Sequence, residues 1–368
     1  GDVFVSALKS IAPLLVFFLV ISSLCNAGKS HGGVIKTVIV LYMFSTVLAA
    51  VIAVFASMAF PVKMTLANAA TDTSAPQGIV EVLNNLLLNV VANPVSSLVN
   101  ANYVGILMWA VLLGLAFRAA DKMTKKVLAD VADGISMVVT WIINLAPFGI
   151  FGLVFNTVST NGLDIFTTYG KLLLLLVGCM LFIYFVTNPL LVYWCIRQNP
   201  YPLIFQCLKR SALTAFFTRS SAANIPVNMK VCEEMGLDRD TYSVTIPLGA
   251  TINMDGAAIT ITVMTMATAF TLGIHVDIPT AIILSLLAAL SACGASGVAG
   301  GSLLLIPMAC SLFGISDDIS MQVVAVGFII GVVQDSVETA LNSSSDLLLS
   351  ASAEFRQWRL EGKEIKFK

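Results

Sequence analysis

The sequence predicts an all-α protein that crosses a membrane several times. Hydrophobic residues make up 58% of the 368 residues and charged residues only 11%, against roughly 45–50% and about 25% in soluble domains. Several apolar stretches approach or exceed the roughly 20 residues that a helix needs to span a bilayer. The third observation is a row of polar residues at helical spacing inside the last apolar segment.

Five apolar stretches are predicted as membrane spans. They lie near residues 11–25, 34–60, 103–117, 135–158 and 172–196. The chain starts with Gly1 rather than Met, and residues 1–10 are typical of an amphipathic lead into a span. We therefore expect further sequence upstream and no signal peptide.

The basic residues predict the orientation. If the first span starts outside, one side of the membrane collects most Lys and Arg residues, including Arg197 and the basic end of the chain. Lys63 and Lys171 fall on the other side. Cytoplasmic loops carry the excess of Lys and Arg, so we expect a cytoplasmic C-terminus, with residues 351–368 as a tail. The net charge of −1 does not indicate nucleic-acid binding.

Cysteine and histidine placement predicts no transition-metal site. The seven cysteines show no CxxC spacing and lie in or beside apolar segments, so we interpret them as packing residues. His31 and His275 stand in loop-like sequence without a neighbouring metal ligand.

Beyond Tyr201 the apolar segments become shorter and are interrupted by Ser, Gly, Asn and Asp. Two interruptions, AFFTRSSAANIP at 215–226 and ALSACGASGVAGGSLLLIP at 289–307, place a small polar tip between two apolar arms. Arms this short predict re-entrant hairpins, with ordinary loops as the alternative. Paired broken elements in the second half of a transporter indicate a binding site near the middle of the membrane.

Between these hairpins, the run GATINMDGAA interrupts an apolar helix at 245–267. Gly249 and Gly256 permit local unwinding, which frees backbone carbonyl groups. Asn253 and Asp255 add side-chain oxygens. This mixture of oxygen ligands suits a hard cation such as sodium. The alternative is that Asp255 is a structural hydrogen-bond hub.

A polar stripe follows near the C-terminus. Its members, spaced by three, four and four residues, are Asp335, Glu338, Asn342 and Asp346. On a helix they fall within an arc of about 80°, opposite an apolar side. Carboxylates inside a membrane cost several kcal/mol unless they face a cavity with cations, water or a polar substrate. The stripe therefore predicts a transport site.

Three runs carry a resemblance to a known family: TRSSAANIP at 218–226, NMDG at 253–256 and NSSSD at 342–346. In this order, with two hairpins around the NMDG helix, they resemble the dicarboxylate/amino acid:cation symporters, which include the glutamate transporters. The resemblance covers the whole chain, with the family's first transmembrane helix expected upstream of Gly1. It implies a glutamate-transporter-like fold, a homotrimer in the bacterial inner membrane, and elevator-type alternating access.

The resemblance also implies a division of the chain. Residues 1–33 and 81–160 are expected to form the scaffold and trimer contacts, whereas the helix and outer loop at 34–80 join the transport domain at 161–350. The expected parts of that domain are a first hairpin at about 200–235, the NMDG helix at about 241–272, a second hairpin at about 276–313 and a last helix at about 319–350.

By the same resemblance, sodium ions, in a number the sequence does not give, accompany the substrate. One ion is expected at Asp346 with carbonyls of Gly249, Asn253 and Asn342. A second is expected at Thr251 and the backbone of the second hairpin. The expected ligands of a third are Asp255, Asn253 and, from the run YMFST, Tyr42, Ser45 and Thr46.

The substrate's amino group is expected at Asp335, and its carboxylate at Asn342 and at the first tip, Ser220 and Ser221, with Thr339 beside them. The second hairpin is expected to be the gate. Its hinge glycines are Gly294, Gly297 and Gly300. Family members usually have a proline where this tip has Ala299.

Glu338 stands where members that carry glutamate or aspartate have an Arg. Two like charges about 4 Å apart repel by roughly 4 kcal/mol at an effective dielectric of about 20, so an acidic substrate is expected to be rejected. Members that carry acidic substrates are expected to have a hydroxyl residue where this chain has Ala257, so Ala257 also argues against an acidic substrate. The pattern resembles bacterial members that carry serine and threonine, small neutral amino acids. The alternative is an acidic amino acid or dicarboxylate symporter.

Arg219 in the first tip is expected to neutralise Glu338 or Asp335, because unpaired buried carboxylates are costly. The alternative is that Arg219 extends to the cytoplasm. Two other classes of function fit less well. An intramembrane enzyme would need a GxGD motif or a His placed to activate a serine, and a channel would not need occluding hairpins.

Overall fold

The computed structural model describes residues 2–26, 33–66, 91–100, 102–145, 164–293 and 300–365, with a few isolated positions between 88 and 159. These residues form helices and turns without any β-strand. The predicted all-α class is therefore confirmed.

The helices of the first part are α1 (Asp2–Asn26), α2 (Gly33–Ala59), α4 (Pro94–Val99), α5 (Tyr103–Ala116) and α6 (Lys122–Asn144). The second part contributes α8 (Asp164–Phe182), α9 (Asn188–Ile196), α10 (Tyr201–Cys207), α11 (Leu213–Thr218), α12 (Ser221–Glu234), α13 (Arg239–Ile252), α14 (Asp255–Thr271), α15 (Ile278–Ala292), α16 (Ile306–Ser311) and α17 (Asp317–Leu360). π-helical turns at Ile183–Thr187 and Leu208–Ala212 join α8 to α9 and α10 to α11.

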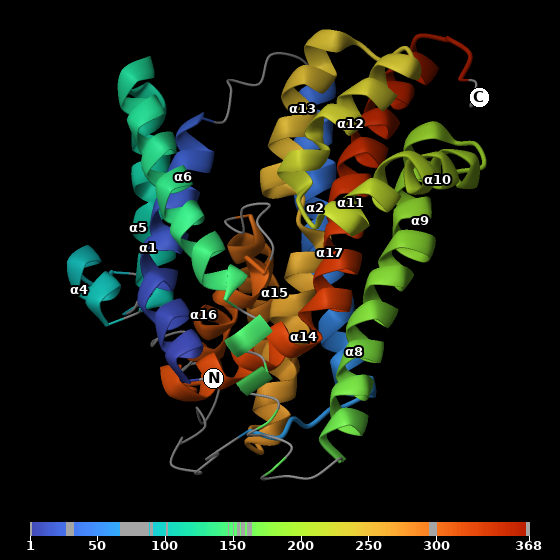
Figure 1. Ribbon diagram of the computed structural model, residues 1–368. Coiled ribbons are helices and arrows are strands. Elements are labelled where there is room, and N and C mark those ends of the chain that lie inside the picture. The colour runs from blue at the N-terminus through green and yellow to red at the C-terminus, as the bar shows by residue number, and fades with distance from the viewer. Residues whose placement is uncertain are drawn as a thin grey trace.

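The helices lie in two groups (Figure 1). In one group α1 packs against α5 and α6, and in the other α2 packs against α13, α14, α15 and α17. The segment around α16 contacts both groups, through α5 on one side and α14 and α17 on the other. These groups contain the residues expected for scaffold and transport domain, and movement of one against the other stays a prediction.

Within the described residues, three helices are long and apolar enough to cross a membrane: Gly33–Ala59, Tyr169–Ile196 and Asp317–Leu360. The helices predicted at 34–60 and 172–196 are present, and both are long and apolar enough to cross a membrane. The predicted start of a span at 135 is wrong, because α6 already begins at Lys122 and ends at Asn144. Its first half is amphipathic, with Lys126 exposed and Ala132 buried, so hydropathy alone misses it.

The last helix also extends further than expected. Residues 351–360, predicted as a tail, continue α17 up to Leu360. Arg359 Nε donates to the carbonyl of Cys195 at 3.1 Å, and the Arg356 guanidinium lies 5.4 Å from the Trp194 ring centroid. Glu354 accepts the backbone N–H of Asp238 at 2.7 Å. These contacts with α9 and the turn before α13 keep the segment helical.

The predicted interruptions appear where the sequence placed them. α13 ends at Ile252 and α14 begins at Asp255, so the helix breaks at Asn253 and Met254. α11 and α12 flank a tip in which Arg219 adopts a left-handed φ of 49°. In the second element, Gly300 has a φ of 73°, and a Cβ there would lie 2.9 Å from Phe328 Cε1, so only glycine fits.

Amide hydrogen bonds fasten the first hairpin element to α17. Asn224 Nδ2 donates to Ser343 Oγ at 2.9 Å, and Asn228 Nδ2 donates to the carbonyl of Ser343 at 2.8 Å. Asn224 Nδ2 also reaches Ser211 Oγ, in the π-helical turn of the other arm, at 3.0 Å. These buried amides tie both arms of the hairpin to one point on the last helix.

Replacing Asn228 with Ala removes the hydrogen bonds to Ser343. We expect a loss of about 1 kcal/mol of stability, seen as a lower unfolding temperature in detergent. Lys230→Ala, an exposed position on the same helix, is the matched control. Equal unfolding temperatures for both variants would contradict the fastening role of Asn228.

Candidate functional site

Buried polar groups meet where the break between α13 and α14 faces α2 and α17. From α2, Ser45 Oγ donates to Asp255 Oδ2 at 2.8 Å and Thr46 Oγ1 to Asp255 Oδ1 at 3.2 Å. Tyr42 OH donates to the carbonyls of Asp346 at 2.9 Å and Thr245 at 3.2 Å. The structure thus brings together the α2 residues that were expected to share an ion with Asp255.

The other side of this cluster is α17. Asn253 Nδ2 donates to Asp346 Oδ1 at 2.9 Å and to Ser345 Oγ at 2.8 Å. Asn342 Oδ1 accepts the backbone N–H of Gly256, the second residue of α14, at 2.7 Å. The unwound residues between α13 and α14 are therefore held by the same turns of α17 that carry Asn342 and Asp346.

Two buried oxygens of the cluster have no hydrogen-bond partner: Asp346 Oδ2 and Asn253 Oδ1. Asp255 and Asp346 are 0% and 1% exposed, and their charges repel one another. Among the described residues, no Lys, Arg or His forms an ion pair with either carboxylate. Two buried carboxylates without a basic partner carry a large desolvation cost, so the cluster is suited to binding a cation.

The donor set fits a hard cation. It consists of carboxylate, amide, hydroxyl and carbonyl oxygens, which sodium and similar ions prefer over nitrogen or sulfur. Within the part of the chain that the structure describes, no group of three or more His, Cys, Asp or Glu side chains could hold a transition metal.

Gly249 allows the close approach of α13 to this cluster. A Cβ at this position would lie 2.8 Å from Asp346 Oδ1 and 2.9 Å from Tyr42 OH. Any side chain would therefore displace the carboxylate that Gly249 was expected to assist. Thr251 is different, because its hydroxyl donates to the carbonyl of Leu248 in its own helix at 2.7 Å. Its role in a second ion site stays a prediction.

Glu338 is held by three neutral donors. Its Oε2 accepts hydrogen bonds from Thr260 Oγ1 of α14 at 2.6 Å, from Ser302 Oγ at 2.9 Å, and from Gln334 Nε2 one turn earlier on α17. Gln334 Nε2 also donates to Thr260 Oγ1 at 2.8 Å, which directs the threonine proton to Glu338. Glu338 is only 6% exposed, so these groups replace water around it.

The sequence analysis missed Thr260, Ser302 and Gln334. Gln334 precedes Glu338 by one helical turn, so helical spacing could have suggested it. Nothing in the sequence indicates that Thr260 and Ser302 both donate to the same oxygen of Glu338, because they lie 78 and 36 residues before Glu338 in the chain.

Asp335, the expected amine contact, accepts the backbone N–H of Gly300 at 3.2 Å. The charge of Arg219 acts on Asp335, although no ion pair within 4 Å joins Arg219 to Asp335 or Glu338 in the structure. Direct pairing of Arg219 with either carboxylate stays a prediction.

The remaining expected residues are placed as follows. Ser221 is buried at the start of α12, directly after Ser220, so the tip presents the N-terminal end of a helix, which favours an anion. Thr339 is 6% exposed beside Glu338 on α17, and Ala257 is fully buried on α14. Gly294 and Gly297, like Ala299, lie outside the described residues.

Comparison with known proteins identifies the family. The sequence profile of the Sodium:dicarboxylate symporter family matches residues 1–354. The chain belongs to this family. It is also 59% identical over 366 residues to the serine/threonine transporter SstT of Bifidobacterium adolescentis, covering 99% of this chain and 85% of the relative. The resemblance found in the sequence is confirmed, and the chain is a multi-pass membrane transporter rather than an enzyme.

Replacing Gly249 with Ala places a methyl group against Asp346 and Tyr42. We expect the sodium concentration for half-maximal binding to rise about tenfold, equivalent to about 1.4 kcal/mol. The measurement is the sodium dependence of the unfolding temperature of the purified protein. Gly170→Ala is the control, because a Cβ there has no neighbour within 4 Å. An unchanged sodium dependence in Gly249→Ala would contradict the assignment.

Proposed function

We propose that this chain is a sodium-coupled symporter for small neutral amino acids, with L-serine and L-threonine as substrates. The observation that carries the proposal is the pair of buried carboxylates, Asp255 and Asp346, which lack any basic partner among the described residues. Cations must neutralise them when the site is occupied. The substrate class is supported by the 59% identical relative, whose name gives serine and threonine.

Two cation sites are proposed in the buried polar cluster. Asp346, with carbonyls of Gly249, Asn253 and Asn342, is proposed to hold one sodium ion. Asp255 is proposed to hold another with Asn253 and the α2 hydroxyl groups, namely those of Tyr42, Ser45 and Thr46. The orphaned oxygens Asp346 Oδ2 and Asn253 Oδ1 support this assignment, because each leaves a buried lone pair for a ligand. Thr251 remains proposed for a further ion.

The substrate is proposed to lie between α17 and the two tips. Its ammonium group meets Asp335 and its carboxylate meets Asn342 and the tip at Ser220 and Ser221, with Thr339 alongside. In the structure Asp335 accepts a hydrogen bond from the backbone N–H of Gly300. A substrate ammonium group that binds Asp335 would replace this donor. Coupling follows because the cations fix the turns of α17 that present Asn342 to the substrate.

Glu338 sets the substrate class in this proposal. The hydrogen-bond partners of the buried Glu338 carboxylate are two hydroxyl groups and an amide, none of which is positively charged. These partners therefore provide no cation to pair with the side-chain carboxylate of an acidic substrate. The alternative, transport of acidic amino acids or dicarboxylates, would place two negative charges close together in a site of low dielectric. Arg219 is proposed to balance Asp335, on which its charge already acts.

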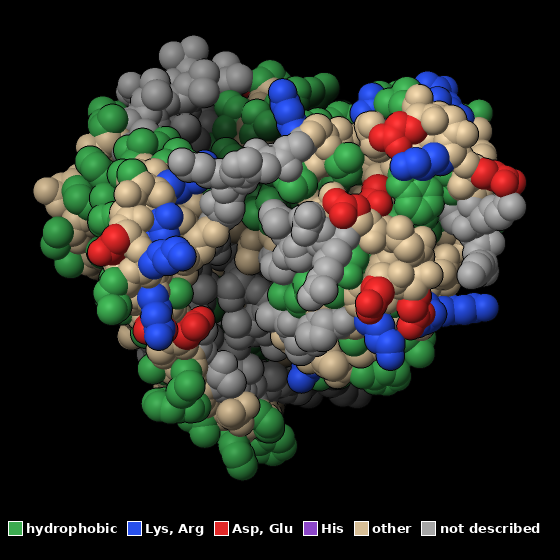
Figure 2. All heavy atoms as spheres, turned by 90° about the horizontal axis from the view of Figure 1, so that it is seen from above, with side chains coloured by type: hydrophobic (Ala, Val, Ile, Leu, Met, Phe, Trp, Pro, Cys, Tyr) green, Lys and Arg blue, Asp and Glu red, His purple; other side chains and the backbone are tan. Residues whose placement is uncertain are grey.

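The membrane arrangement belongs to the same proposal. The hairpin elements around Arg219 and Gly300 are proposed to be re-entrant, and the group around α17 to move as an elevator against α1, α5 and α6 within a homotrimer. The C-terminus is proposed to be cytoplasmic in the bacterial inner membrane. Figure 2, which shows one end of the molecule from above, supports an aqueous surface there, because charged side chains are spread across it.

Uptake into proteoliposomes tests the function. With an inward sodium gradient, labelled L-serine is expected to accumulate, whereas L-aspartate is not. Without the gradient, accumulation is expected to be lost, because unneutralised carboxylates disfavour the occupied state. Sodium-independent serine uptake, or faster uptake of aspartate, would refute the proposal.

Replacing Glu338 with Gln tests the origin of specificity. The amide keeps the shape and can still accept from Thr260 and Ser302, but it removes the negative charge. We expect aspartate to compete with serine uptake at a concentration at least about tenfold lower, because the like-charge repulsion of a few kcal/mol is gone. Glu354→Gln, which changes a buried carboxylate at the far end of α17, is the control. Unchanged competition by aspartate would contradict the role of Glu338.

A further inference from the structure

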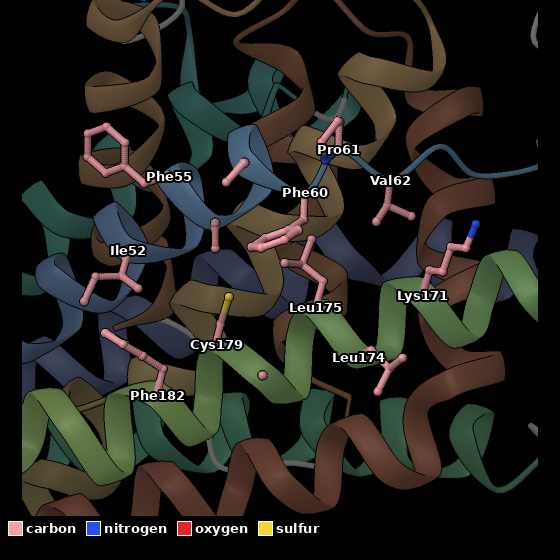
Figure 3. Close-up of a pocket in the computed structure, with 13 residues that line it drawn as sticks. Ile52, Phe55, Phe60, Pro61, Val62, Lys171, Leu174, Leu175, Cys179 and Phe182 are labelled. Atoms are coloured by element: carbon pink, nitrogen blue, oxygen red, sulfur yellow. The ribbon is translucent and has the colours of Figure 1, made fainter.

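A large apolar groove lies between α2 and α8, and no residue of the polar cluster is among the residues that line it (Figure 3). Its volume is about 860 Å³. Small residues form part of its lining, namely Ala56 and Ala59 from α2 and Gly178 from α8. Their small side chains do not fill the space between the two helices, and this leaves the groove open.

Large apolar side chains border this space. Phe55, Phe60 and Phe182 are 53%, 69% and 47% exposed and also line the groove. Both helices are candidate membrane spans, so in a bilayer these rings face hydrocarbon rather than water. An acyl chain is the occupant that such a surface accepts without any hydrogen-bonding partner.

One end of the groove carries positive charge. Of the described residues that line the groove, only Lys171 is charged, and its amino group points away from the apolar side chains at the margin of the view in Figure 3. Lys63 follows the lining residue Val62 and is also exposed. Among the residues that the structure describes, neither lysine forms an ion pair and no acidic side chain lines the groove.

The ends of the two spans locate this positive end. The apolar span of α2 ends at Ala59, and the span that contains α8 begins at Tyr169. Lys171 and the residues after Ala59 therefore lie where membrane spans meet the headgroup layer, and the remainder of the groove runs along the hydrocarbon. Lysine at this level extends its amino group toward phosphate and buries its methylene groups.

We propose that this groove binds one anionic phospholipid, with an acyl chain against the small residues and the phosphate at Lys171. The site is separate from the proposed transport site and does not depend on it. It lies wholly on helices of the α17 group. A lipid bound there contacts the part of the molecule that is proposed to move.

Photocrosslinking in proteoliposomes tests the proposal with the full chain. The probes are phosphatidylglycerol and phosphatidylcholine that carry a diazirine in one acyl chain, and labelled peptides are identified by mass spectrometry. We expect residues 52–62 and 171–182 to be labelled about fivefold more by phosphatidylglycerol, the preference that one lysine near an anionic headgroup provides. Exposed Leu190 of α9 reports the labelling of the general lipid surface and is expected to show no preference.

Two variants separate the headgroup from the groove. Lys171→Gln is expected to reduce phosphatidylglycerol labelling to the phosphatidylcholine level. Gly178→Leu is expected to reduce labelling by both lipids, because a side chain there meets no protein atom within 4 Å at Cβ and extends into the groove. Lys122→Gln, an exposed lysine of α6, is the control, and retained unfolding temperatures show that the variants fold.

Three outcomes would overturn the proposal. Equal labelling by the two lipids would remove the anionic preference. A preference that persists in Lys171→Gln would place the headgroup elsewhere. Absence of labelling by either lipid at residues 52–62 and 171–182, with normal labelling of α9, would show that protein rather than lipid fills the groove.

Discussion

The structure depends on holding two carboxylates, Asp255 and Asp346, in the interior with no basic side chain paired to them among the described residues. Each accepts hydrogen bonds from neutral groups: Asp255 from Ser45 and Thr46, and Asp346, through one of its two oxygens, from Asn253. Neutral donors lower the cost of a buried charge but do not cancel it. The break between α13 and α14 serves this arrangement, because Asn253 reaches Asp346 from backbone that is not helical.

One helix connects this cluster with the rest of the proposed site. α17 presents Asp346 and Asn342 to the break, and Glu338 and Asp335 one and two turns earlier to α14 and the Gly300 segment. A rotation of α17 that improved one set of contacts would disturb the others, since all four side chains lie on one face. The proposed cation sites, the proposed substrate contacts and the hairpin positions therefore all depend on one helix.

The sequence was sufficient where a feature depends on composition or on helical periodicity. It predicted the all-α class, the break at Asn253 and the polar face of α17. It could not predict contacts set by tertiary packing, such as the sharing of Glu338 by Thr260 and Ser302. The start of α6 and the helical end of α17 were missed for a related reason: amphipathic and charged helical turns carry little hydropathy signal.

The two hairpin elements are attached to α17 by different chemistry, and this difference bears on the roles proposed for them. Asn224 and Asn228 hold the first through amide bonds to Ser343, a residue with no proposed contact to substrate. The second is held by Gly300 N–H on Asp335 and by Ser302 on Glu338, the carboxylates that are proposed to face the substrate. If the substrate's ammonium group binds Asp335 as proposed, it competes with the second element only, so its binding would alter that attachment and leave the first unchanged. This asymmetry is the physical reason to propose the second element as the gate.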